Sequence, residues 1–157
     1  MPLRRAATFA ALLSFTGGCS SAYIPRPGPR VSILMEGGTI AYQRDGKRYE
    51  GGLFGGDIEE AVKGNPQAEE YARAYKAGTI GGFVGSMLGL GGMIGGLSLA
   101  AAESQPGAGQ NASVPGLAIA GAGLVAYLVG AAVMFNAVPH LYDAVNVYND
   151  GLASPTP

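Results

Sequence analysis

The sequence predicts a mainly α-helical membrane protein, in which a two-helix transmembrane hairpin follows a small N-terminal module with a β-meander and short helices. The first observation is that residues 77–102 and 115–138 contain no charged side chain. As helices they would reach roughly 36–39 Å, enough to cross a bilayer core of about 30 Å. The second is that all 10 Lys and Arg residues lie before Ala77. The N-terminal half of the chain is therefore rich in charge, and the C-terminal half is mainly apolar.

Composition excludes several classes of protein. Charged residues make up 13% of the 157 residues, about half of the roughly 25% usual in soluble domains. The net charge of −1 argues against a nucleic-acid partner. One cysteine excludes a disulfide framework and a metal site built from several cysteines. The length fits one domain.

Residues 1–18 have the pattern of an export signal. Two arginines precede the short apolar stretch 6–15, and small residues follow it. The stretch is too short to span a bilayer. The segment 16–19, Thr-Gly-Gly-Cys, resembles the lipobox of bacterial lipoproteins, although Thr16 stands where that motif has an aliphatic residue. The resemblance implies lipidation of Cys19, and the alternative is ordinary cleavage near Gly18 with an unmodified cysteine.

Residues 19–30 are expected to form a tether. Three prolines at positions 25, 27 and 29 favour an extended path. Ser20 after the cysteine resembles lipoproteins sorted to the outer membrane. Lys and Arg lie only before the first apolar span, so the positive-inside rule would place that side of the span in the cytoplasm. A cleaved export signal would place the same side in the periplasm. Residence in the outer membrane removes that conflict, so the expected location is the bacterial cell envelope, with the outer membrane slightly favoured over the inner.

Residues 31–76 are expected to form a small β-then-α module. Apolar runs separated by glycine turns predict strands at 31–36, 39–43 and 48–50. Asp57 is expected to cap a short helix that ends near Lys63. Another helix is expected to begin at Pro66. Its acidic and basic residues are expected to form a solvent-exposed face.

The two apolar spans, joined by a loop at 103–114, carry small residues at intervals of four. Such residues let two helices approach closely in lipid. This pattern resembles the glycine-zipper two-helix domains of some bacterial envelope lipoproteins. We expect the hairpin to pack within one chain, and leftover small-residue faces could also drive homo-oligomers. The expected packing residues are Gly81, Gly85, Gly89, Gly92, Gly96, Ala118, Ala122, Ala126 and Gly130.

The tail 139–157 is expected to be an amphipathic interfacial segment, with Pro139 redirecting the chain. His140 and Asp143 could bind a metal or exchange protons, but a single histidine lacks the further groups that either role needs. Residues 121–126 match a dinucleotide fingerprint, yet too little chain follows for a parallel sheet. No catalytic, cofactor or metal site is expected.

The expected function is a structural or complex-organising role for a small, exported, membrane-anchored envelope lipoprotein. Its expected partners are the lipid bilayer and either further copies of the chain or an envelope membrane complex. The alternative is an oligomeric pore or permeability factor built from the glycine-rich helices. An enzyme based on His140 and the acidic pairs is the weakest of the three hypotheses.

Overall fold

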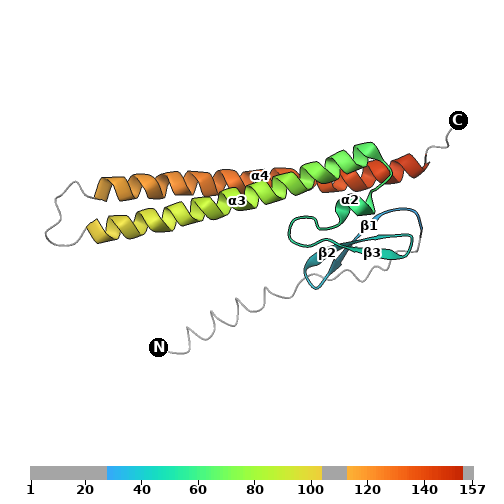
Figure 1. Ribbon diagram of the computed structural model, residues 1–157, viewed down its shortest axis with the longest axis horizontal. Helices are drawn as coiled ribbons and strands as arrows, with labels where there is room; N and C mark the ends of the chain where they lie inside the picture. The colour runs from blue at the N-terminus through green and yellow to red at the C-terminus, as the bar shows by residue number, and fades with distance from the viewer. Residues whose placement is uncertain (1–27, 104–112, 154–157) are drawn as a thin grey trace, which may run out of the picture. The chain divides into compact units, whose positions relative to one another are not determined.

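The computed structural model describes residues 28–103 and 113–153 (Figure 1). The predicted export signal, Cys19, most of the expected tether and most of the expected loop lie outside these residues. The chain divides into two compact units. One comprises the described residues up to Glu69 together with those from Ala144 onward, and the other comprises Glu70–Asp143.

The first unit contains a three-stranded antiparallel sheet, which confirms the predicted meander. Its strands are β1 (Ser32–Glu36), β2 (Thr39–Arg44) and β3 (Lys47–Glu50), in the order β1-β2-β3. Gly37 and Gly38 connect β1 to β2 with φ of 57° and 81°. Asp45 and Gly46 connect β2 to β3 with φ of 52° and 76°. Two consecutive positive φ angles define the tight turns whose twist matches that of paired strands.

A small core lies between the sheet and α2 (Ile58–Ala61). Tyr42 on β2 is fully buried, and so are Ile58 on α2 and Val62 directly after α2. Asp57 precedes this helix at the N-cap position, as predicted, but its side chain makes no capping hydrogen bond. Asp57 instead donates its backbone N–H to the Glu50 carbonyl at 2.8 Å. Pairing with the end of β3 therefore fixes the start of α2.

The helix α3 (Pro66–Glu103) begins where the sequence predicted. Asn65 Oδ1 accepts a hydrogen bond from the Ala68 N–H at 3.2 Å, and Glu69 Oε1 accepts one from the Gly64 N–H at 2.9 Å. The first bond satisfies a donor that a helix start leaves open, and the second ties Glu69 to the turn that precedes the helix. The proline at the first helical position needs no such partner.

The end of the helix α4 (Ser113–Ala153) is tied to the sheet by an asparagine. Asn149 Oδ1 accepts a hydrogen bond from the Val31 N–H at 2.8 Å, and Asn149 Nδ2 donates to the Val31 carbonyl at 3.0 Å. The side-chain amide thus satisfies both polar groups of a backbone residue that is 3% exposed.

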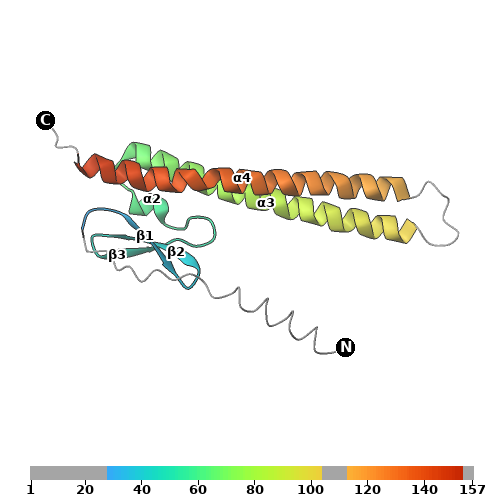
Figure 2. The same cartoon turned by 180° about the vertical axis from the view of Figure 1, so that it is seen from behind.

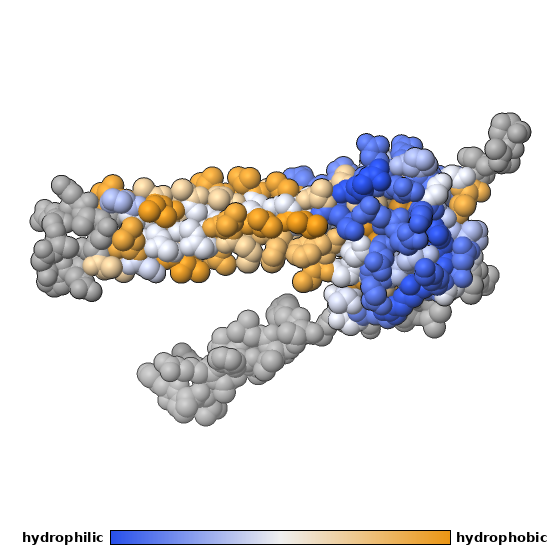
Figure 3. Space-filling view, in the orientation of Figure 1, coloured by the Kyte–Doolittle hydropathy of each residue, from blue (hydrophilic) through white to orange (hydrophobic). Residues whose placement is uncertain are grey.

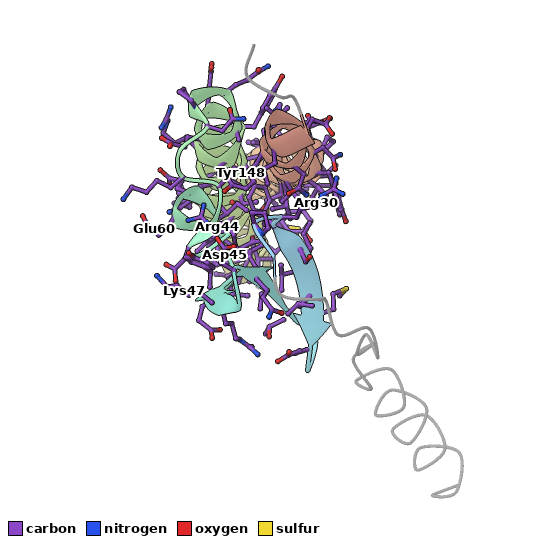
Figure 4. All side chains as sticks on the ribbon, turned by 90° about the vertical axis from the view of Figure 1, so that its right-hand side faces the viewer. Arg30, Arg44, Asp45, Lys47, Glu60 and Tyr148 are labelled. Carbon is purple, nitrogen blue, oxygen red and sulfur yellow. The ribbon has the colours of Figure 1, made fainter. Side chains whose placement is uncertain are left out.

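Arg44 provides a second tie within this unit. Its Nη1 donates to the carbonyls of Ala61 and Lys63, at 2.8 and 3.1 Å, and to the Tyr148 hydroxyl at 3.2 Å. The guanidinium also lies 5.4 Å from the centre of the Tyr148 ring, a cation–π contact. Figure 4 shows these two side chains next to each other. One cation therefore joins β2, the end of α2 and α4.

In the second unit, α3 and α4 run side by side and antiparallel (Figures 1 and 2). Near one end Gly78 contacts Ala137, and near the other Gly96 contacts Ala120. Both helices are long and apolar enough to cross a membrane. The fold class is confirmed to this extent, since two long apolar helices follow a small antiparallel sheet.

Pro139 does not redirect the chain, contrary to the sequence-based expectation, because α4 continues through it. A proline inside a helix removes one backbone hydrogen bond. Leu141, Ala144 and Val145 beyond it are 6% exposed or less, so their burial holds the next turns in helical form. The span and the tail that the sequence separates are one helix.

We expect Asn149→Ala to expose the Val31 amide to exchange. Losing both partners of a buried backbone residue costs about 1–3 kcal/mol, so the Val31 N–H should exchange with deuterium about fivefold faster or more. Asn146→Ala, at an exposed position of the same helix, is the matched control and should change nothing. An unchanged Val31 rate in Asn149→Ala would contradict the tie.

Candidate functional site: the glycine seam between two apolar helices

Glycines bring the two helix backbones into direct contact in the second unit. A methyl group at Gly89 would lie 2.2 Å from the Tyr127 nitrogen, and one at Gly96 would lie 2.3 Å from the Ala120 nitrogen. Carbon and nitrogen atoms cannot approach so closely without bonding. Any larger residue at these positions would force the backbones apart.

The other helix contributes in the same way. A methyl group at Gly123 would lie 2.3 Å from the Met93 nitrogen, and one at Gly130 would lie 2.4 Å from the Ser86 nitrogen. We call this contact line the glycine seam. Its members are Gly78, Gly82, Gly89 and Gly96 on α3, and Gly116, Gly123 and Gly130 on α4.

The seam follows a seven-residue repeat and not the four-residue ladder read from the sequence. Gly82, Gly89 and Gly96 are seven apart, and so are Gly116, Gly123 and Gly130. A repeat of seven corresponds to 3.5 residues per turn, which keeps one face toward a partner helix over many turns. The signal was therefore present in the sequence as two sets of three glycines.

The structure places the expected packing residues in three groups. Gly89, Gly96 and Gly130 lie in the seam, whereas Gly85 and Gly92 lie at its edge, where a methyl group would sit 3.4 Å from the facing glycine Cα. Around Gly81 there is open space. Ala118, Ala122 and Ala126 are exposed in the single chain. The four-residue reading did not include Gly78, Gly82, Gly116 and Gly123.

Two hydroxyl groups lie buried along the seam. Thr79 and Ser86 are each 5% exposed. The Thr79 hydroxyl donates to the Tyr75 carbonyl at 2.9 Å, within its own helix. The Ser86 hydroxyl reaches the Tyr127 carbonyl on α4 at 3.4 Å. Small residues and interhelical hydroxyl bonds are the means by which helices associate in lipid.

Large apolar side chains face outward from the helix pair. Phe135 is 77% exposed, Leu88 72% and Val125 61%. Figure 3 shows hydrophobic residues over most of the visible face of this pair, while hydrophilic residues gather over the sheet unit. A water-soluble helix pair buries its large apolar residues and exposes polar ones. This unit has the reverse arrangement.

The outer face carries a shallow apolar groove of about 320 Å³. Phe83 and Met87 line it from α3, and Tyr127, Met134 and Phe135 line it from α4. The groove has few polar groups, so it offers no means of orienting a polar ligand.

His140 and Asp143 do not form a built chemical site. The His140 Nδ1 lies 3.9 Å from an Asp143 oxygen, which is too long for a hydrogen bond. The imidazole instead stacks on Tyr71, with 6.0 Å between ring centres. Within residues 28–103 and 113–153, no three His, Cys, Asp or Glu side chains are grouped so that they could hold a metal ion.

The glycine pattern at 121–126 lies in the middle of α4. A dinucleotide fingerprint needs a strand, a tight turn and a helix start at these glycines. Gly123 serves the seam instead, so the match has a packing explanation.

We expect Gly89→Ala to destabilise the helix pair, because its methyl group would overlap the α4 backbone. Overpacking of this kind costs about 1–3 kcal/mol. Gly91→Ala is the matched control, since nothing lies within 4 Å of its added methyl group. The control should raise stability by up to about 1 kcal/mol through helix propensity. Thermal unfolding in detergent, followed by circular dichroism, measures both; equal midpoints would contradict the seam.

No protein-family model, curated protein or solved structure matches this chain.

Proposed function

We propose that this chain is a membrane-anchored protein of the bacterial cell envelope, in which the α3–α4 hairpin lies in the bilayer and holds the sheet unit in water. Its role is structural: it organises a membrane complex through contacts with further copies or with a partner. The observation that carries the proposal is the inverted distribution of apolar side chains in the helix pair.

The energetics of the helix pair favour lipid over water. In water, each glycine costs a helix about 1 kcal/mol relative to alanine, and outward-facing side chains such as Leu88 and Phe135 would remain exposed. Only 17% of the most apolar 18-residue stretch of α4 is buried within the chain. In hydrocarbon, unsatisfied backbone groups cost more than the glycines do, so the helices form regardless.

The sheet unit has the surface of a water-facing module. Arg48 forms ion pairs with Glu36 and Glu50, and Lys63 pairs with Glu60. These side chains are about half exposed or more. A covalent link to a membrane hairpin keeps such a unit beside the bilayer.

The organising role is supported by small residues that the single chain leaves uncovered. Ala118, Ala122 and Ala126 are exposed and lie four residues apart on α4. In lipid, a face of small residues allows a neighbouring helix to approach closely. Crosslinking in native membranes that traps only monomer would contradict this role.

Export and lipidation are part of the same proposal and are supported by the sequence at 1–19. Stable anchoring generally takes two signals, and a lipid and a hairpin together would supply them. The two anchors can be separated by experiment because they involve different residues.

The hairpin anchor is tested in a Cys19→Ala chain fused to a leader that ordinary signal peptidase removes. Without the lipid, this chain should remain in the membrane pellet after carbonate extraction. Adding Val125→Arg and Leu128→Arg, at two outward positions near the middle of the apolar stretch 115–138 of α4, should release most of it, since each arginine costs about 2.5–3.5 kcal/mol there. The control pair, Asn146→Arg with Asp150→Arg, should stay in the pellet.

If the chain without lipid remains in the supernatant as a compact monomer in the absence of detergent, the membrane proposal fails. Palmitate labelling of the native chain tests the second anchor. We expect label in the wild type and none in Cys19→Ala, and an unlabelled wild type would remove lipidation from the proposal.

A further inference from the structure

The outer edge of β1 has a defined pattern of backbone groups. The two-residue turn at Gly37–Gly38 makes Glu36 and Thr39 a hydrogen-bonded pair. In an antiparallel ladder such pairs alternate along the strand, so Leu34 also bonds to β2. Ile33 and Met35 then point their N–H and carbonyl groups away from β2.

A bond at the other side of β2 supports this assignment independently. The Gly51 N–H donates to the Ile40 carbonyl at 3.0 Å, in continuation of β3. Ile40 therefore faces β3, and its neighbours Thr39 and Ala41 face β1. The alternation is the same from both sides of the sheet.

The first outward-facing residue of this edge already has a partner. Val31, two residues before Ile33, forms both of its backbone hydrogen bonds with the Asn149 side chain. An amide there imitates the peptide group of an added strand. Among the described residues, the outward backbone groups of Ile33 and Met35 have no such partner.

The two edge strands of the sheet differ in how well they are protected against the addition of another strand. The β3 edge carries Lys47, Arg48 and Glu50, and charged side chains are a common means of preventing strand addition. The β1 edge has no Lys, Arg or Pro. Its one charge, Glu36, is neutralised by an ion pair with Arg48. The β1 edge is therefore open to another strand.

We propose that the β1 edges of two copies of this chain pair with each other, antiparallel about a two-fold axis at Leu34. This register places Ile33 of each copy opposite Met35 of the other, and these outward-facing residues can exchange four backbone hydrogen bonds. Ser32 lies opposite Glu36, so no like charges meet. The two three-stranded sheets join into one.

The length of the available edge favours a second copy over an unrelated peptide. Beyond Ile33, the edge is occupied by Asn149, so an added strand must end there. In the two-fold register, Val31 lies opposite Gly37 of the other copy. At Gly37 that strand has already entered its tight turn. The β1 strand of a second copy therefore ends where the free edge ends.

The strength of this pairing rests on the proposed function, because it requires that both copies are held in one membrane. Four hydrogen bonds and a few apolar side chains bury far less than the roughly 1,200 Å² of a stable soluble interface. Confinement of both copies to one membrane raises their effective concentration and orients them. The small interface would then be sufficient.

The test is photocrosslinking in native membranes with the full chain. A photoreactive benzoylphenylalanine replaces Met35, which is 43% exposed, in copies that carry two different tags. We expect a light-dependent dimer containing both tags, with the crosslink mapped to residues 31–36 of the second copy.

Ile33→Pro removes an outward N–H without touching the β1–β2 bonds, a position where edge strands accept proline. It should reduce the crosslink tenfold or more, while Ile33→Val should leave it unchanged. Slow exchange of the Leu34 amide verifies that the sheet remains folded in the proline variant. Ile33→Lys, which leaves the backbone intact, should also lower the yield.

Three results would overturn the pairing: a membrane-bound chain without a dimer crosslink, a crosslink to a different protein or to α3 or α4, and a crosslink unaffected by Ile33→Pro and Ile33→Lys. The fractionation step keeps the two proposals distinguishable. A chain found in the supernatant contradicts the membrane anchor, whereas a membrane-bound chain without the dimer crosslink contradicts the pairing alone.

Discussion

The structure of the helix pair depends on one steric constraint, which is that the α3 and α4 backbones touch. Gly89 against Tyr127 and Gly123 against Met93 leave no room for a side chain. Because small residues occupy the contact, the large ones can only point outward. The same constraint therefore produces both the seam and the apolar exterior.

The sheet unit depends on long-range ties more than on its own core. Three short strands bury too little surface to fold alone when few of their side chains are large and apolar, and here the core has few large side chains besides Tyr42, Ile58 and Val62. Asn149 and Arg44 compensate by joining the sheet to segments about a hundred residues away in the sequence. The Asn149 bond also determines how much of the β1 edge remains open. A tie that stabilises the unit thus also limits what can bind to it.

The packing register of the glycines shows how much of the candidate site can be predicted from the sequence. Intervals of four are the usual signal of close helix contact, and Gly81, Gly85 and Gly89 satisfy them. Yet two helices that stay together over many turns follow a repeat of 3.5, which selects Gly82 over Gly81. The nine glycines of the first span fit either repeat in part. Only the positions of the facing atoms on α4 distinguish them.

Residue order alone determined the antiparallel meander, the tight turns at Gly37–Gly38 and Asp45–Gly46, the helix start at Pro66 and the two long apolar helices. These features follow from local chemistry: positive φ at glycine, the fixed φ of proline, and uninterrupted stretches without charge. The tertiary structure decided which glycines touch, that α4 continues through Pro139, and that Asn149 and Arg44 secure the sheet. These outcomes depend on atoms that come into contact only after distant segments pack together, so no local sequence pattern predicts them.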